Sequence, residues 1–559
     1  MKSANATVRM GLALVSLLVP VSAIAQGAIP NVFNPNETEL QKQSHFLTFV
    51  GSYIPETATS GRAYYNAIDP NQTKRTFTQW LKYAGFIGQE SDWQPYGQQT
   101  ILTGQPTGAG AYGPNIINTD SHAIVLNAAD LGFVRNQFVR CKPSCSARNP
   151  IIFTYLENYP VAPFAASGSK FGSGGSSYPT QAEATAAIKS AIQRPLGALN
   201  PATGTGDGGV CPGPDVCVER IADVAFEWSA GENAATNSTT RFGQLLAYIF
   251  SHNGGGITET IAFPDGAIGK SVINGVPVLD YSTGQQRAIQ GPLSAADPFA
   301  DPFAPNLDGL GFKQMPGVCL VCHGGKPSRL TSTGAYPRKG MIDGFRLLPL
   351  DNRNLMFPDV PFPGIGDFTL GAQEPQIKKY NQAVLATVAA QPQRDDQGVI
   401  RPPHIAEVIR GWYSTGGNYS NDTTMSSPTQ NGGWIPKGWR ESPNGTAPAG
   451  SEKVYGDVVG PSCRSCHFNR ELSLDFGTSA NFHQESDLLQ LSLLAECKQN
   501  NPDPNAKFMP LAHLTFQRFW EASDGSKTLT GPYQLGHTVD ELANAFNQNG
   551  VAGYCATNP

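Results

Sequence analysis

The pattern C-x-x-C-H occurs twice in the sequence, as Cys319-Leu-Val-Cys322-His323 and as Cys463-Arg-Ser-Cys466-His467. The 559 residues include only ten cysteines and nine histidines, so two such matches would be rare by chance. Two thiols three residues apart on one helical turn can each form a thioether with a vinyl group of a porphyrin, and the following imidazole can bind its iron. This is the pattern of c-type haem attachment. We therefore predict two covalent haem c groups, with His323 and His467 as iron ligands.

Other interpretations of the paired cysteines fit less well. Zinc ribbons also use C-x-x-C pairs, but those pairs lie about 15–20 residues apart. A thioredoxin-like redox motif needs a strand before it and a helix after it, and does not explain a histidine in the same place twice. If the motif cysteines formed ordinary disulfides, the histidine that follows each pair would be a coincidence. Attachment of haem is the interpretation that uses every residue of both motifs.

The first 25 residues have the order of a secretory signal peptide. Lys2 and Arg9 precede an apolar segment at residues 10–21, and the small-residue pattern A-I-A ends at Ala25. The apolar segment is shorter than the ~20 residues that a membrane-spanning helix needs. We predict cleavage after Ala25 and a periplasmic or secreted bacterial protein without a membrane span. An uncleaved signal anchor is the alternative.

Composition narrows the class of partner. The 44 acidic and 39 basic residues give a net charge of −5, which argues against nucleic-acid binding through counterion release. Only 15% of residues are charged, against about 25% in an ordinary soluble domain. The 60 glycines and 44 prolines predict long, turn-rich connections, and the 53 aromatic residues require buried cores. We expect redox partner proteins, or a small-molecule electron donor or acceptor.

The residue patterns predict an α+β protein. Residues 26–300 form a predicted β-rich domain of unknown role, and residues 301–451 the first haem c region. In the first of these we expect helices at 37–50, 74–85 and 180–194, strands at 122–126, 151–155, 218–228 and 258–263, and a hairpin at 271–279. Beyond residue 300 the chain becomes mainly helical, with helices predicted at 375–390, 404–413, 453–459, 485–497, 511–522 and 538–549.

Residues 452–559 resemble a class I cytochrome c domain that carries the second haem. The resemblance rests on an entering helix with Tyr455, on C-R-S-C-H, on Met509-Pro510 and on a closing helix at residues 538–549. In that family the methionine before the proline binds the iron opposite the histidine, and the resemblance implies this role for Met509. A thioether opposite an imidazole raises the reduction potential. A core methionine at this position is the alternative, and His483 and His513 are rival ligands.

More broadly, residues 218–559 resemble large exported bacterial di-haem proteins of unassigned activity. The resemblance rests on N-L-D-G-L-G-F before C-L-V-C-H-G-G, then I-R-G-W-Y, W-I-P-K-G-W, C-R-S-C-H, and M-P with F-x-x-F-W. Di-haem peroxidases and rubber-cleaving oxygenases share the two motifs and export. The resemblance implies two haems and no particular reaction.

The second axial ligand of the first haem is open, because no Met-Pro pair follows His323 at a comparable distance. The candidates are Met341, Met356, His404, His252 and His122. For His122, which opens an apolar strand, a hydrogen-bonded core histidine is the favoured interpretation. If no side chain binds this iron, the haem is five-coordinate and can bind peroxide or dioxygen.

Three functions follow from these alternatives. The first is electron transfer through two haems. The second is an oxidoreductase of peroxidase or oxygenase type, in which the His323 haem has an open distal face and the His467 haem supplies electrons. The third is a binding module, in which residues 26–300 recognise a polymer or a partner protein. We favour the first.

Six cysteines lie outside the motifs, an even number in an exported chain. Six cysteines allow fifteen pairings, so the connectivity stays open. Candidate disulfides are Cys141–Cys145, Cys211–Cys217 and Cys497–Cys555, and a bond from Cys141 or Cys145 to the 211–217 loop is an alternative. A calcium site is conceivable, but a proline-rich linker without EF-hand spacing is the favoured interpretation of its candidate ligands. Those candidates are Asp297, Asp301, Asn306 and Asp308.

Overall fold

A computed structural model describes the parts of the chain that carry both motifs and the central sheet. The described residues are 58–74, 76–93, 100–104, 112–113, 115–128, 130, 132–145, 150–159, 181–193, 222–229, 244–252, 259–261, 269–273, 276–280, 315–325, 330–336, 340, 342, 344–389, 393–394, 400–401, 403–422, 424–468 and 475–484. Several predictions lie outside these residues. They are the signal peptide, the helices at 37–50, 485–497, 511–522 and 538–549, the boundary near residue 300, Met341, Met509, His513, the calcium candidates, and the Cys211–Cys217 and Cys497–Cys555 bonds.

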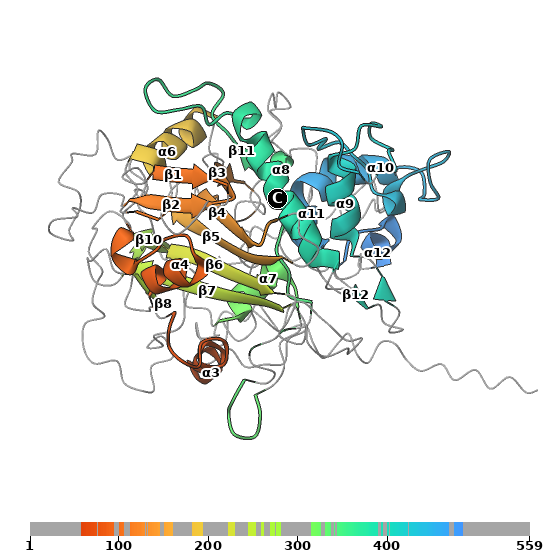
Figure 1. Ribbon diagram of the computed structural model, residues 1–559. Coiled ribbons are helices and arrows are strands. Elements are labelled where there is room, and N and C mark those ends of the chain that lie inside the picture. The colour runs from red at the N-terminus through yellow and green to blue at the C-terminus, as the bar shows by residue number, and fades with distance from the viewer. Residues whose placement is uncertain are drawn as a thin grey trace, which may run out of the picture.

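The described part of the chain is an α+β structure built on a seven-stranded antiparallel sheet (Figure 1). The strand order is β11-β3-β4-β5-β6-β7-β8. The bounds of these strands are β3 Ser121–Asn127, β4 Val134–Lys142, β5 Ile151–Tyr159, β6 Ala222–Ser229, β7 Gln244–His252, β8 Glu259–Ile261 and β11 Leu355–Met356. Strand β11 comes from the predicted first haem region, and so the sheet joins segments from both sides of residue 300.

The sheet has two covered faces. The register places His122 opposite Phe138, and Phe138 opposite Tyr155, so these side chains share one face, the His122 face. Helix α4 (Phe77–Ala84) covers this face, where the Trp80 indole contacts the Tyr155 ring. The opposite face carries Phe226 and is called the Phe226 face. Helix α8 (Leu370–Ala389) packs on it beside β3.

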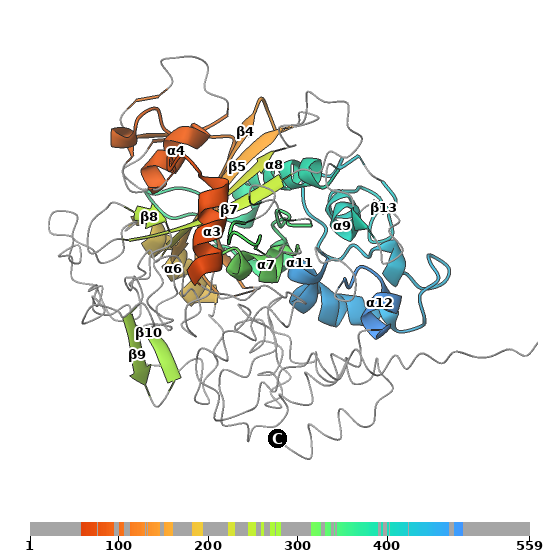
Figure 2. The same ribbon diagram turned by 90° about the horizontal axis from the view of Figure 1, so that it is seen from below.

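The remaining elements surround the sheet, with the helices of the second motif gathered on one side of it (Figures 1 and 2). The other helices are α3 Ala58–Ile68, α6 Gln181–Gln193, α7 Gly317–His323, α9 His404–Trp412, α10 Ser451–Val454, α11 Arg464–His467 and α12 Ser479–Gln484, with a π-helix at Tyr455–Cys463. Short 3-10 helices are η1 Glu90–Asp92, η4 Asn352–Asn354 and η5 Lys437–Trp439. Two-stranded pairs are β1 Thr100–Thr103 with β2 Ile116–Thr119, β9 Gly269–Ile273 with β10 Val276–Asp280, and β12 Gln393–Arg394 with β13 Ile400–Arg401.

Most of the predicted elements that fall on described residues are confirmed, with shifted ends. Helix α4 starts at Phe77 rather than at residue 74, because the Thr76 hydroxyl accepts a hydrogen bond from the Gln79 amide (3.2 Å) and caps the helix. Helix α8 starts five residues earlier than predicted and contains Pro375. The hairpin at 271–279 is confirmed as β9 and β10.

Several described elements were not predicted, and the largest of them are strands β4 and β7 and helix α3. Strand β4 alternates charged and apolar residues only in part, yet it is an interior strand between β3 and β5. Strand β7 and helix α3 were also missed, and they pack together. The Tyr64 hydroxyl accepts a hydrogen bond from the Ala247 amide (2.9 Å), so α3 protects the outer edge of β7.

Among the described residues, no helix is both long and apolar enough to cross a membrane.

His122 is a core histidine, as its position in an apolar strand predicts. Its Nε2 lies 2.6 Å from Asn136 Oδ1, and its ring stacks on Phe138 at 4.6 Å between centroids. Burial lowers the pKa of His122 from its ordinary value to about 4. The imidazole is therefore neutral in the folded protein at pH 7.

The buried His122 predicts a loss of stability in acid. Between pH 6.5 and pH 4 the unfolded chain binds a proton at His122 and the folded chain does not, so the free energy of unfolding falls by up to about 3 kcal/mol as the pH falls. Chemical denaturation at pH 7, 5.5 and 4 measures this loss. We expect His122→Gln to lose less stability than the natural chain over this range. Equal losses in the two proteins would contradict the prediction.

Candidate di-haem site

The first motif lies on a single short helix. Cys319, Cys322 and His323 occupy α7, which ends where Gly324 adopts a positive φ of 71°. His323 Nδ1 lies 2.7 Å from the backbone carbonyl oxygen of Arg346. A carbonyl can only accept, so Nδ1 carries the proton and Nε2 is the lone-pair nitrogen. The same arrangement orients histidines that bind metals.

Aromatic rings and close backbone packing surround the His323 imidazole. Its ring centroid lies 4.6 Å from that of Phe226 and 5.9 Å from that of Phe345. Burial lowers the pKa of His323 to about 4, so the imidazole is neutral at pH 7. Gly325 has a φ of 103°, and a Cβ there would lie 3.0 Å from the Phe345 backbone nitrogen. The chain can approach this closely only because the residue is glycine.

The second motif closes a continuous helical segment from residue 451 to residue 467. Its middle part is a π-helix, which contains Pro461 and ends with the Arg464 amide bonded to the Val459 carbonyl. The prediction of a helix at residues 453–459 is confirmed, but the helix extends through the motif. The His467 ring stacks in parallel on Phe476, with 4.1 Å between centroids.

The two motifs are neighbours in space. Helix α7 packs against α11, although their motifs are far apart in the sequence (Figure 2). One segment, residues 346–354, contacts both. At its start the Arg346 carbonyl faces His323, and at its end Asp351 and Asn354 contact the second motif.

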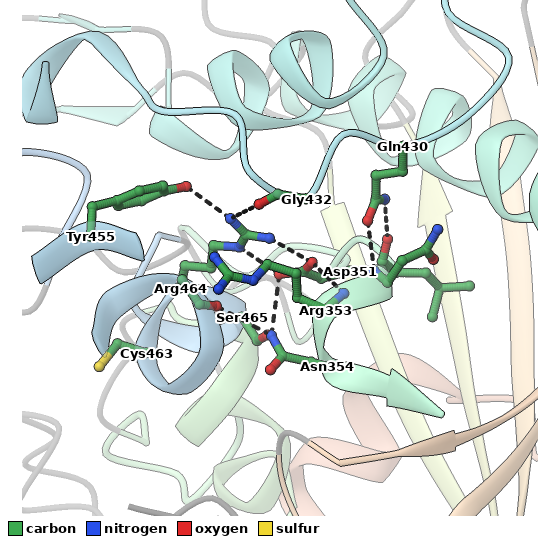
Figure 3. Close-up of polar contacts among 12 residues, drawn as sticks. Asp351, Arg353, Asn354, Gln430, Gly432, Tyr455, Cys463, Arg464 and Ser465 are labelled. Carbon is green, nitrogen blue, oxygen red and sulfur yellow. Dashed lines mark hydrogen bonds and ion pairs between the residues drawn. The ribbon is translucent and has the colours of Figure 1, made fainter. Parts of the chain in front are cut away.

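A buried ion pair fixes the second motif to this segment (Figure 3). Arg464, the first variable residue of C-R-S-C-H, donates from Nε and Nη2 to the two carboxylate oxygens of Asp351 at 2.5 and 2.7 Å. Its Nη1 donates to the Tyr455 hydroxyl at 3.0 Å and the Gly432 carbonyl at 3.3 Å. The guanidinium also lies 5.0 Å above the Trp412 ring. Each of the three guanidinium nitrogens therefore donates at least one hydrogen bond.

Neighbouring residues strengthen the same junction. Asn354 Nδ2 donates to the Ser465 hydroxyl at 2.9 Å, and Arg353 Nη2 donates to the Gly456 carbonyl at 2.8 Å (Figure 3). Gln430 Nε2 donates to the Leu350 carbonyl at 2.9 Å. Of these residues only Ser465 lies in a recognisable sequence motif, so the contacts could not be predicted from the sequence.

The positions of the motif residues bear on the zinc interpretation of the cysteines. Among the described residues, the set Asp120, Cys141 and Cys145 is the one group of three potential metal ligands with all ligand atoms within 4.8 Å. The motif thiols and imidazoles do not converge in this way, as a zinc site requires. Haem attachment instead needs sulfurs that reach the porphyrin edge while the imidazole lies under the iron. Among the described residues, neither motif therefore shows the converging ligands of a zinc site.

The thiols also differ from those of redox-active cysteine pairs. Burial raises the pKa of Cys463 to about 12 and that of Cys319 further still. A thioredoxin-like cysteine has a lowered pKa and reacts as a thiolate. None of the four motif cysteines is part of a disulfide.

The structure places three candidates for the second ligand of the His323 iron. Phe226 and His323 lie on one face of the sheet, whereas His122 is on the other, hydrogen-bonded to Asn136. Met356 pairs with Leu126 and shares the His122 face. The sheet therefore separates both candidates from His323. The side chain of His252 and all of Met341 lie outside the described residues.

His404 lies beside the second motif. Its Nδ1 is 2.8 Å from Asp475 Oδ2, and its ring is 6.5 Å from that of Phe468, the residue after His467. A Cβ at Gly477 would lie 2.0 Å from the imidazole, so glycine is needed for this contact. The rival ligand His483 belongs to α12, but its side chain lies outside the described part of the chain.

Cys141 and Cys145 form a disulfide, as expected, with 5.0 Å between their Cα atoms. The alternative bond to the 211–217 loop is therefore wrong. The disulfide also removes both sulfurs from the Asp120 cluster as metal ligands.

Comparisons with protein-family models, with curated proteins and with solved structures give no match for this chain.

The ion pair of Arg464 makes a prediction about stability. Replacing Asp351 with asparagine leaves a buried guanidinium without its counter-charge, which costs about 3–5 kcal/mol of unfolding free energy. Asp359→Asn is the matched control, because Asp359 is exposed a few residues further along, and surface changes of this kind alter stability by about 0.5 kcal/mol or less. Chemical denaturation of both variants is the measurement. Equal stability of the two variants would contradict the role of the pair.

Proposed function

We propose that the chain carries a covalent haem at each C-x-x-C-H motif and transfers electrons through the pair. The observation that carries this proposal is the packing of α7 against α11, which brings the two attachment turns together. Electron transfer slows steeply with distance, so neighbouring turns favour exchange between the two centres. Each haem, when bound, supplies an iron that accepts and releases one electron.

The residues of the chain bind and orient these groups. In each motif the two cysteines are the proposed thioether positions, and His323 and His467 are the proposed iron ligands. The Arg346 carbonyl fixes the tautomer and orientation of His323. Asp351 and Arg464 fix the second turn relative to the segment that carries that carbonyl. The two sites are thereby held in one rigid junction.

The proposal also includes the domain order, the second ligand of the His467 iron, and export. We propose that the β-rich part precedes a di-haem cytochrome c-like part, and that Met509 is the second ligand of the His467 iron. We also propose export after cleavage at Ala25 and exchange of electrons with redox partner proteins or small molecules. The disulfide between Cys141 and Cys145 supports an oxidising compartment.

A second candidate function is an oxidoreductase of peroxidase or oxygenase type. The observation that favours it is the position of His122 and Met356, both across the sheet from His323. The apolar rings of Phe226 and Phe345 line the imidazole instead. Fewer candidates for a second side-chain ligand remain, which supports an open position on that iron.

Cysteine substitutions test the attachment sites. We expect the Cys463→Ala/Cys466→Ala protein to keep one haem, with half the haem absorbance per chain after alkaline pyridine treatment, because each motif binds its own haem. The Cys141→Ala/Cys145→Ala protein removes the same number of cysteines and should keep both haems. A natural chain without haem absorbance, or equal haem content in all three proteins, would contradict the proposal.

Carbon monoxide distinguishes the two candidate functions. An open position on the His323 iron predicts that the dithionite-reduced protein binds carbon monoxide at half of its haem, and that the Cys463→Ala/Cys466→Ala protein still binds it. The measurement is the shift of the Soret absorption band. A reduced protein that does not bind carbon monoxide would exclude the oxidoreductase and leave electron transfer alone.

A further inference from the structure

Two basic side chains of β4 converge on the His122 face, on the other side of the sheet from the first motif. Arg140 and Lys142 are two residues apart on one strand and so point to the same face. Lys142 Nζ lies 4.9 Å above the Phe153 ring, and Lys142 pairs in register with Ile151. This pair of cations takes no part in the haem proposal.

Arg140 is buried without enough partners. Only 6% of its surface is exposed, and Nη2 donates to the Tyr112 hydroxyl at 3.0 Å. Its Nε and Nη1 have no hydrogen-bond partner among the described residues. A buried guanidinium with unmet donors is costly, so a ligand that accepts from them would be bound favourably.

The side chains of Lys142 and Arg140 both lie next to Gly85. A Cβ placed on Gly85 would lie 3.1 Å from Arg140 Nε and 3.4 Å from Lys142 Nζ. Gly85 ends α4 with a φ of 83°, and because it has no side chain, both cations lie against its backbone. Burial lowers the pKa of Lys142, and the nearby charge of Arg140 lowers it further.

The neighbouring charges do not neutralise this pair. Glu227 is the carboxylate that acts on Lys142, but both its oxygens accept from Lys74 Nζ, at 2.9 and 3.0 Å, and one also accepts from the Trp80 indole. The carboxyl end of α4 offers only partial negative charge, and the Gly85 amide already bonds to the Leu81 and Lys82 carbonyls. Among the described residues, an excess of positive charge therefore remains at Arg140 and Lys142.

We propose that Arg140 and Lys142 form a binding site for an oxyanion, the carboxylate or phosphate group of a small molecule. The anion accepts charge-assisted hydrogen bonds from the unmet Arg140 donors and from the Lys142 ammonium, above Gly85. The exposed Tyr83 ring, 51% accessible and 5.9 Å from Phe153, gives the site an apolar rim. This site does not depend on the haem proposal.

Calorimetric titration of the full chain, purified as it is expressed, tests the site. The probes are inorganic phosphate and acetate, each added in 150 mM sodium chloride at pH 7, so that binding is measured against a constant background of chloride. We expect saturable binding of at least one probe. Lys142→Gln should weaken it at least tenfold, because one charge-assisted contact is lost. Lys142→Arg keeps the charge and should bind within about threefold of the natural chain.

Lys189→Gln is the control, because Lys189 is an exposed lysine on α6 and its loss removes the same charge elsewhere. The control should bind both probes as the natural chain does, and circular dichroism checks that every variant is folded. The proposal is overturned if neither probe binds saturably, or if folded Lys142→Gln binds as tightly as the control. Arg140 and Lys142 would then only stabilise the carboxyl end of α4. Stronger binding of phosphate than of acetate, or the reverse, identifies the group that the site accepts.

Discussion

The buried pair of Arg464 and Asp351 is the interaction on which the arrangement of the two motifs depends. An arginine inside a C-x-x-C-H turn is buried because a carboxylate meets it with two hydrogen bonds and a tyrosine and a carbonyl take a third donor. Removing charges from water is expensive, so such a pair is stable only when its geometry is good on both sides. The pair therefore fixes one relative position of the second motif and the segment at residues 346–354.

The segment at residues 346–354 contacts both motifs. Its first residue accepts the hydrogen bond that orients His323, and its last residues bind the second turn. The sheet completes the first site, since Phe226 packs on the imidazole while His122 and Met356 stay on the opposite face. Among the described residues, the first site therefore has an apolar environment, with His122 and Met356 across the sheet from it. The second site has a stacked Phe476 and the His404–Asp475 pair nearby.

The sequence was sufficient to predict what is local. The spacing of C-x-x-C-H, the strand at His122, the helix ending at Gly85 and the Cys141–Cys145 bond all depend on residues a few positions apart. It could not predict the packing of α7 on α11 or the partner of Arg464, because Asp351 belongs to no motif and is more than a hundred residues away. Strand β4 was missed because its buried polar residues, such as Asn136, find partners only across the sheet. Cross-strand hydrogen bonds replace the hydrophobic alternation that would have indicated a strand.

The central claim is that the chain binds two haems covalently. Mass spectrometry of the purified, exported protein under denaturing conditions tests it most directly, because thioether-linked haem stays on the chain when non-covalent cofactors are lost. We expect the mass of the chain from residue 26 plus two haems. The mass of the chain alone, or with a single haem, would contradict it.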